Sequence, residues 1–349
     1  MSQRLIAALI AGPLVLALLV TAAFLPLPYV TYAPGYTVDV LAEDAGAEII
    51  QVDGAKTYRD DGELRMTTVL VSVPKVRKNL FDLMLVWAKS DDAVYPYDAV
   101  YGKEDTAESN DREGAVSMVT SQDAATAVAL RQLGYPAKSA VEVAFVEPGS
   151  PSEGKLLVRD IILEVDGVPL KDPQQLVAAI SKAKPGQTVD FKVRRVRTDY
   201  DVSIVPREVD GDRRIGITPG IGYLFPFDVR VDIDPDIGGP SAGLMFSLAI
   251  YDTLTPGSLT GGKVVAGTGE IAADGTVGPI GGIQQKIAGA RDDGAELFLV
   301  PPDNCGEALG ANNDDMRLVK ATTMPIALKA IQDWVQDPDA TLPSCEDAS

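Results

Sequence analysis

A serine and a lysine are the residues of this chain whose types and surroundings favour covalent catalysis. Ser241 lies in the glycine-rich run Gly238–Gly243, and Lys286 follows a second such run, Gly278–Gly282. The chain contains no histidine, which excludes a Ser-His-Asp triad and makes a lysine the natural general base for a serine nucleophile. These residues therefore predict serine catalysis with a lysine base.

Both residues also have ordinary structural interpretations. A serine after a proline is typical of a helix start with a side-chain cap, and the run around Ser241 taken alone favours that interpretation. A single lysine most often lies on the exposed face of an amphipathic helix. Lys286, however, recurs with Ile283 and Ile287 at helical spacing, so we expect it to face the core, where burial lowers the pKa of a lysine.

The small residues around Ser241 leave room for a substrate backbone to approach closely. They also leave main-chain N–H groups free at the start of the next helix, where a developing oxyanion would be stabilised. Gly239 and Ala242 flank this part of the run, and we expect both to support the site.

The serine and the lysine must be positioned by strands and helices, and the sequence predicts several of these. The strict alternation of Phe227–Asp234 predicts a half-buried strand, whose acidic face we interpret as solvated rather than metal-binding. Ser241–Leu254 then predicts a helix with a buried stripe. A strand over Val264–Ile271 and a helix over Ile283–Asp292 are expected to follow.

Two further expectations concern the chain before these elements. Ser121–Leu133 predicts an amphipathic helix that Ser121 caps and that the segment beginning at Gly134 stops. The polar segment Asp91–Gly114 predicts a loop that projects outward. The helix is therefore expected to begin well after this loop.

Length and charge limit the classes of partner. A chain of 349 residues indicates two or three domains. Its formal net charge of −19 argues against a surface that follows nucleic-acid phosphates, so we expect no nucleic-acid partner. Without histidine or a CxxC pattern, a zinc site is also not expected, and we predict no metal.

One segment comes close to a nucleotide-binding motif. Gly257–Lys263 has the spacing of a phosphate-binding loop, but Val264 stands where a Ser or Thr would bind magnesium. No other segment has the features of an ATP site. We therefore expect neither ATP nor any other cofactor.

The N-terminus predicts export of the rest of the chain. The uncharged run Leu5–Leu25 could span the roughly 30 Å hydrocarbon core of a bilayer as one helix. Arg4 precedes it and no Lys or Arg follows before Lys56, so the positive-inside bias places the N-terminus in the cytoplasm. We expect a single-pass anchor in the cell membrane with an extracytoplasmic body. Small residues at Thr21–Ala23 keep a cleaved signal peptide as the alternative.

The middle of the chain, Ala137–Arg207, contains the segments Val146–Pro151 and Asp160–Gly167 and the turn Pro185-Gly186. On these residues it resembles a PDZ domain of the bacterial kind. It implies a β-rich domain that binds a peptide as an added strand, whereas the alternative is a domain that only packs against its neighbours. The position of its carboxylate-binding loop stays open, because no clear glycine signature precedes Val141.

The C-terminal third is similar to the protease domain of the Lon family. The resemblance implies a serine endopeptidase with Ser241 as nucleophile, Lys286 as general base and Thr268 near the lysine. It also implies a homo-oligomer, since protease domains of this family often form rings. The matching segments are Gly238–Gly243, Gly267–Glu270, Gly278–Gly282, Lys286 and Val300–Asn304.

The sequence departs from the family in three respects. Gly238 stands where a charged or polar residue is usual, and the loop before it is short. In place of the ATPase domain stand the anchor and the PDZ-like segment, so the resemblance does not extend to the unfolding of stable substrates. This arrangement looks like that of membrane-anchored, PDZ-containing Lon-like proteases of Gram-positive and actinobacterial type.

The expected fold is multidomain α+β: a transmembrane helix, a β-rich PDZ-like domain and a C-terminal Lon-type α+β protease domain. The expected function is ATP-independent cleavage of peptide or protein substrates that the PDZ-like domain selects. The alternatives are a catalytically silent or self-processing peptide-binding scaffold and a structural or assembly factor at the membrane. The expected regions are an anchor and linker (1–35), an N-terminal α+β region (36–136), the PDZ-like domain (137–208), the protease domain (209–336) and a tail (337–349).

The two cysteines, Cys305 and Cys345, flank the last expected helix, Ile326–Val335. Outside the membrane, in an oxidising compartment, we expect them to pair and to hold the tail on the protease domain. Two separate thiols are the alternative.

Overall fold

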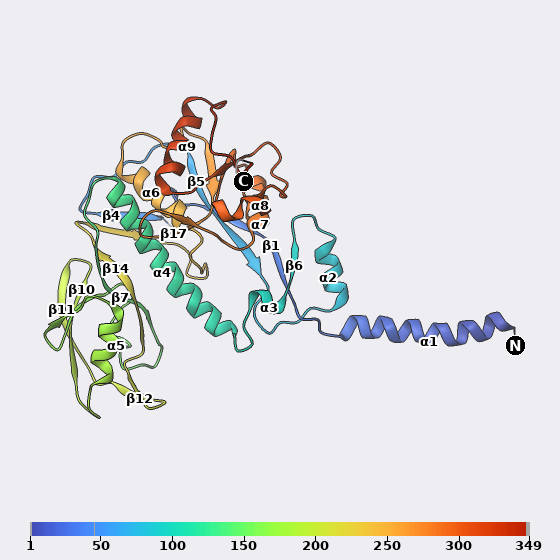
Figure 1. The fold of residues 1–349 in the computed structure, drawn as a ribbon, viewed down its shortest axis with the longest axis horizontal. Helices are drawn as coiled ribbons and strands as arrows, with labels where there is room; N and C mark the ends of the chain where they lie inside the picture. The colour runs from blue at the N-terminus through green and yellow to red at the C-terminus, as the bar shows by residue number, and fades with distance from the viewer. Residues whose placement is uncertain (1, 45, 347–349) are drawn as a thin grey trace.

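The computed structural model describes residues 2–44 and 46–346, and Figure 1 shows a body of two lobes from which one helix projects. That helix, α1 (Gln3–Phe24), contains a window with a mean hydropathy of 2.6 and no buried residue. Within the described residues it alone is long and apolar enough to cross a membrane, although a signal sequence would pass the same test.

A six-stranded sheet forms the large lobe, in the order β20-β19-β16-β5-β1-β6. The four strands from β20 to β5 are parallel to one another, whereas β1 is antiparallel to both β5 and β6. Residues 36–136, which we expected as a region of their own, therefore share one sheet with residues 209–336. The strands are β1 (Tyr29–Asp39), β5 (Glu63–Val71), β6 (Ala93–Pro96), β16 (Val264–Gly267), β19 (Leu297–Val300) and β20 (Arg317–Lys320).

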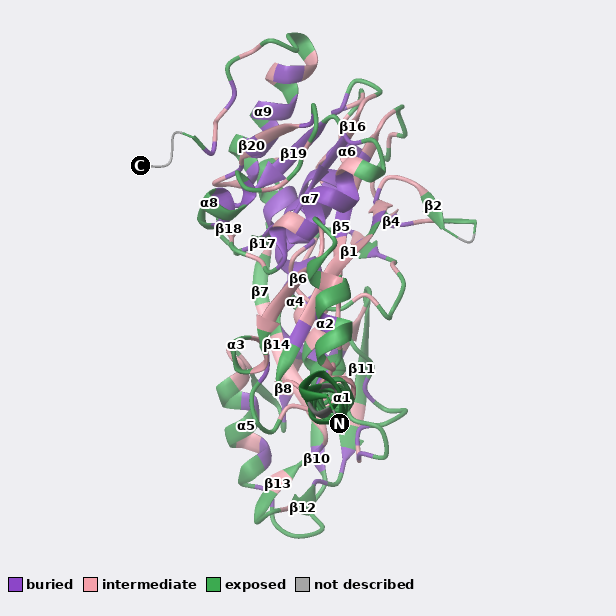
Figure 2. Ribbon diagram, turned by 90° about the vertical axis from the view of Figure 1, so that its right-hand side faces the viewer, coloured by how far each residue is buried: buried purple, intermediate pink, exposed green. Residues whose placement is uncertain are grey.

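Helices cover both faces of this sheet. Successive strand residues point to opposite faces, so Val265 joins one core and Ala266 the other. The first core includes α4 (Ala107–Gln132), α6 (Gly243–Leu254) and α9 (Met324–Gln336), and the second includes α7 (Ile283–Asp292). Figure 2 colours most of α6 and α7 as buried. The sheet therefore lies between α6 and α7. A residue just before α6 and a residue on α7 can meet only beyond the end of a strand that separates them.

Helix α4 is longer than expected and begins earlier. The expected loop over Asp91–Gly114 is wrong, because β6 (Ala93–Pro96) joins the main sheet, α3 (Tyr97–Val100) follows it, and α4 starts at Ala107. Thr106 and Ser109 form a reciprocal capping box that satisfies the first N–H groups of the helix. The expected cap at Ser121 is also wrong: this residue is buried inside α4, and its Oγ donates to the carbonyl oxygen of Pro240 over 2.8 Å.

The small lobe is a sheet in the order β11-β10-β8-β7-β14, with α5 (Pro173–Ser181) packed against it. Its strands are β7 (Lys138–Val146), β8 (Ile161–Val165), β9 (Val168–Pro169), β10 (Val189–Arg195), β11 (Thr198–Ile204) and β14 (Ile217–Leu224). The last of these, β14, comes after the segment 137–208 and pairs antiparallel with β7. A strand from the beginning of the expected protease region thus completes the PDZ-like sheet.

Shorter elements connect the two lobes and the edges of the sheets. The extended ones are β2 (Glu43–Asp44), β3 (Ala47–Glu48), β4 (Ile50–Asp53), β12 (Arg207–Val209), β13 (Asp212–Arg214), β15 (Asp228–Val231), β17 (Glu270–Ile271) and β18 (Val277–Gly278). The helical ones are α2 (Leu80–Trp87), α3 (Tyr97–Val100), η1 (Pro302–Asn304) and α8 (Cys305–Ala308). The strand expected over Phe227–Asp234 is present in its central part, as β15 paired with β4.

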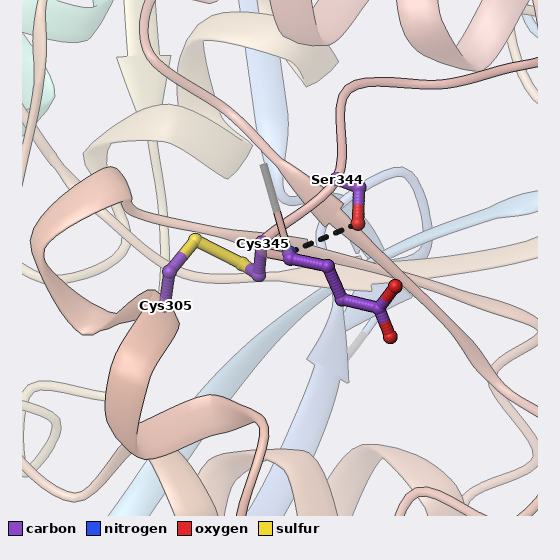
Figure 3. The surroundings of a disulfide bond; sticks show 4 residues. Cys305, Ser344 and Cys345 are labelled. Carbon is purple, nitrogen blue, oxygen red and sulfur yellow. Dashed lines mark hydrogen bonds between the residues drawn. A yellow bond between two sulfur atoms is a disulfide. The ribbon is translucent and has the colours of Figure 1, made fainter. Parts of the chain in front are cut away.

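The tail packs against the large lobe. Cys305 and Cys345 form a disulfide with Cα atoms 4.9 Å apart (Figure 3). Leu342 is buried in the first core, and the carbonyl of Pro343 accepts a hydrogen bond from the N–H of Lys320 over 2.9 Å. Residues 347–349 of the expected tail lie outside the described residues.

Two buried carboxyl groups lie where α4 meets the small lobe. Asp123 of α4 binds Arg159 over 3.1 Å, and Glu142 of β7 lies beside Asp123. Burial, and secondarily the charge of Asp123, raises the pKa of Glu142 to about 10. The fold therefore holds Glu142 in its protonated, neutral form at neutral pH.

We predict that Glu142→Gln stabilises the chain at pH 8. Since the folded-state pKa of Glu142 is raised from 4.5 to about 10, its contribution to stability is greatest below pH 4.5 and declines as pH rises toward 10. Glutamine stays neutral, so at pH 8 the variant should gain about 1 kcal/mol or more. Thermal unfolding in detergent at pH 5 and pH 8 measures the gain. The exposed Glu104→Gln is the control, and an equal shift in both variants would contradict the explanation.

Candidate active site

The structure brings Ser241 and Lys286 together. The Nζ of Lys286 lies 2.9 Å from the Oγ of Ser241 and also donates to the carbonyl oxygen of Thr67 over 2.9 Å. Ser241 lies two residues before the start of α6, Lys286 lies in the first turn of α7, and Thr67 belongs to β5. β5 pairs with β16 only up to Met66 and Gly267. The two side chains thus meet just beyond the point where β16 stops separating the two faces.

The amine of Lys286 is desolvated. Its residue is 2% exposed, on the inner face of α7. Burial lowers the pKa of Lys286 to about 7, because an apolar environment disfavours the charged ammonium. A large fraction of the amine is therefore neutral at physiological pH and able to accept a proton.

A close backbone approach places α7 on the sheet. A Cβ atom at Gly289 would lie 2.6 Å from the carbonyl oxygen of Gly35 in β1. Any other residue would push α7 away from the strand at this point, one turn of helix after Lys286. The glycine thus keeps the lysine within reach of the serine.

The backbone around Ser241 is held from several sides. The carbonyl of Ser241 accepts from the hydroxyl of Thr268 over 3.0 Å and from the N–H of Gly269 over 2.7 Å. Thr268 is buried, and its hydrogen bond holds the main chain of the serine. On the other side, the N–H of Gly239 donates to the carbonyl of Gly114 in α4 over 2.9 Å. These contacts hold the main chain of the serine in place before any substrate binds.

Gly239 and Ala242 have different places in this loop. Gly239 has φ of +93°, which favours glycine, and its N–H is already engaged with Gly114. Within the described residues, neither the N–H of Ser241 nor that of Ala242 donates to a protein acceptor. These two N–H groups at the start of α6 are thus available for an oxyanion.

A cleft of about 170 Å³ lies over the pair. One wall is β5 from Met66 to Leu70, and the other is the loop Asp236–Gly238 with Ser241 and Ala242. β5 continues to Val71 without a partner on its β16 side within the described residues. This free strand edge, next to Lys286, can accept an extended peptide as an added strand.

Several contacts of the site do not show in the sequence pattern. Thr67 acts through its carbonyl oxygen, so its side-chain type gives no signal. Ser121 supports Pro240 from inside α4, and Gly114 binds the loop through its backbone. For Ser121 and Gly114, the sequence signal was only that small or polar residues occur in this segment. The sequence also predicted that α4 begins later than it does. Across residues 2–44 and 46–346, no three His, Cys, Asp or Glu side chains gather as metal ligands would.

Comparison with protein families assigns both lobes. Residues 235–323, which contain Ser241, Thr268 and Lys286, match the Lon protease (S16) C-terminal proteolytic domain. Residues 109–205 match the PDZ domain. The chain thus combines a Lon-type proteolytic domain with a PDZ domain.

The curated relatives agree with the assignment of the proteolytic domain. Lon protease 2 of Bacillus subtilis is 30% identical over 122 residues, which are 34% of this chain and 20% of the relative. The peroxisomal Lon protease homolog 2 of Caenorhabditis elegans is 32% identical over 120 residues, 33% of this chain and 15% of the relative. The chain spans about one fifth or less of the curated relatives it matches. The PDZ domain of an SdrC-like protein from Listeria monocytogenes is 29% identical, with a TM-score of 0.22, over 23% of this chain and 86% of that one.

Proposed function

We propose that this chain, which carries a Lon-type proteolytic domain and a PDZ domain, is a serine endopeptidase with a Ser241–Lys286 dyad. The observation that supports this most is the 2.9 Å contact between the serine hydroxyl and a desolvated lysine amine. Neutral Lys286 takes the hydroxyl proton as Ser241 attacks the scissile carbonyl. The N–H groups of Ser241 and Ala242 stabilise the oxyanion that forms.

The same lysine completes the cycle. The ammonium of Lys286 gives its proton to the leaving amine, which departs and leaves an acyl ester on Ser241. Water then attacks the ester, with the neutral amine again as base, and releases the acid product and free serine. Thr67 holds the amine by its carbonyl oxygen throughout, and Thr268 holds the main chain of the serine.

We propose that the reaction needs no nucleotide. Val264 occupies the place of a magnesium-binding hydroxyl in Gly257–Val264, and the two glycines before Lys263 lie in a surface turn. Incubating the purified full chain with an unfolded protein in buffer free of ATP and magnesium tests this. New N-termini in the substrate are the expected result, whereas cleavage only after ATP is added would contradict the proposal.

The PDZ domain has a groove suited to a peptide. A cavity of about 230 Å³ lies between α5 and the segment that begins β14. Leu176, Val177 and Ile180 form its helix side, and Arg213 and Arg214 lie at the other side. We propose that an unfolded segment or chain end of the substrate binds here, its carboxylate facing the arginines, before another part enters the cleft.

We predict that Val177→Glu separates selection from cleavage. Val177 is 53% exposed in the groove, so a carboxylate there should repel a peptide end without disturbing the core. Cleavage of a protein substrate should fall about tenfold, as expected for roughly 1.4 kcal/mol of lost binding, while cleavage of a short peptide stays unchanged. Val168→Glu, at an exposed valine outside the groove, is the control. Equal losses with both substrates would argue against selection by the groove.

We further propose that α1 crosses the cell membrane with the N-terminus inside. Arg4 is the only basic residue before or within α1, and none follows until Lys56. The body, including the Cys305–Cys345 disulfide, is then extracytoplasmic, where such a bond persists. Protease added to intact cells should digest the body, and protection of the body until the cells are lysed would contradict this topology.

A further inference from the structure

Helix α2 carries an apolar surface that the fold leaves uncovered. We call it the α2 patch and define it by five side chains with exposed fractions between 41% and 83%. They are Leu80 (42%), Phe81 (41%), Met84 (55%), Leu85 (70%) and Trp87 (83%). Only Leu83 of the helix is buried. The single charged residue, Asp82, is engaged in a capping box with Asn79 and so does little to solvate the patch.

The α2 patch lies beside the foot of α1. The N–H of Leu27, three residues after α1 ends, donates to the carbonyl of Lys78 just before α2 begins, over 2.9 Å. Helices α1 and α2 are in direct contact. Figure 1 shows α2 next to the end of α1 from which the body begins, and in Figure 2, which looks along α1, α2 is drawn beside it. A bilayer crossed by α1 would therefore have its surface at the level of α2.

Basic side chains precede the patch. Lys75, Arg77 and Lys78 come within four positions in a chain whose net charge is −19. No salt bridge in the described part of the chain engages any of these three. An apolar helix face with adjacent unpaired lysines and arginines is typical of a segment that lies in the interface of an anionic bilayer.

We propose that the α2 patch inserts into the outer leaflet of the membrane that α1 crosses, a proposal that rests on α1 being a membrane span. The apolar side chains enter the boundary between headgroups and acyl chains, and the three basic side chains bind anionic headgroups. Two attachments then fix the orientation of the body. Since β5 runs from the cleft at Leu70 directly into the segment Val73–Lys78, the cleft is held close to the bilayer and faces membrane-proximal polypeptides.

The two tryptophans provide a direct test. Trp87 belongs to the patch, and Trp334 is buried on α9 with 4% exposure. The Trp334→Phe variant of the full chain keeps Trp87 as its only tryptophan. It is placed in nanodiscs of phosphatidylcholine and phosphatidylglycerol, with or without bromine on the acyl chains. Trp87 emission should fall by roughly half or more in brominated discs, because a ring about 5–10 Å into the boundary contacts the bromine.

Matched variants locate the effect. Trp87→Phe, which keeps Trp334, should show no loss in brominated discs. A protein without either native tryptophan but with Val168→Trp, at an exposed valine of the small lobe, should also show none. Replacing Lys75, Arg77 and Lys78 by glutamate should reduce the Trp87 loss in anionic discs.

Other outcomes overturn the proposal. Equal Trp87 emission in brominated and plain discs, with the protein retained on the disc after a salt wash, rejects insertion of the α2 patch while leaving α1 as an anchor. Blue-shifted but unquenched emission identifies a protein surface, such as a second copy, as the occupant instead. Release from the disc by salt rejects both the α1 span and this proposal. Cleavage of a soluble peptide by the same samples reports separately on the dyad.

Discussion

Replacing Ser241 by alanine is expected to lower kcat/KM for a peptide substrate by about 10⁴-fold or more. The hydroxyl forms the covalent bond, so no remaining group can form the acyl ester. Lys286→Met should cause a loss of the same order, because a serine hydroxyl without a base is a weak nucleophile. The double variant should be no worse than either single one, since the two residues act as a unit. Initial rates with a fluorogenic peptide measure all three.

Folding controls decide what such losses mean. Methionine fills the buried site of Lys286 without a charge, so the melting temperature of Lys286→Met should not fall below that of the parent. Lys329→Met, at a lysine whose side chain is 73% exposed, should keep full activity. Cleavage by both Ser241→Ala and Lys286→Met at the parental rate would contradict the proposed peptidase.

Peptidase activity is expected to rise about tenfold per pH unit below pH 7 and to level off above it. Burial lowers the pKa of Lys286 to about 7, so below this pH the amine is mostly protonated and cannot accept the serine proton. Raising the pH through 7 produces the neutral base, which sets the sign of the effect. At pH 5 the rate should be about one hundredth of the plateau.

The pH profile has its own control. The melting temperature, followed over the same range, separates loss of the base from loss of the fold. A profile that falls between pH 7 and pH 9 while the protein stays folded would contradict Lys286 as base. A profile without any change near pH 7 would also contradict it.

The sequence predicted the burial of Lys286 better than the connections between domains. Its helical spacing with Ile283 and Ile287 predicted that Lys286 faces the core, as it does, because hydrophobic periodicity reports which face of a helix is inside. The pairing of Lys286 with Ser241 was implied by the resemblance to the Lon protease domain and not by either motif alone. The helix over Ile283–Asp292 agrees with its predicted bounds. By contrast, the start of α4 was misplaced. Its first turns are polar because they are exposed, and local polarity does not distinguish an exposed helix from a loop.

Long-range pairing was the other part that the sequence could not supply. β14 completes the PDZ sheet although it follows the segment that resembles a PDZ domain. In the structure, residues from Arg213 onward line the groove opposite α5, and no described residue before Val141 lines it. Likewise, the role of the Thr67 carbonyl depends on β5 extending past its pairing with β16. Both features come from strand order, which no local pattern encodes.

Acylation of the serine by an active-site reagent tests the central claim most directly. The full chain is incubated with a peptide β-lactone, which acylates a nucleophilic serine by ring opening, and the adduct is located by mass spectrometry. We predict one adduct on Ser241, formed faster as pH rises through about 7 and nearly absent in Lys286→Met. An adduct on another residue, or equal labelling of Ser241 in Lys286→Met, would contradict a Ser241–Lys286 dyad.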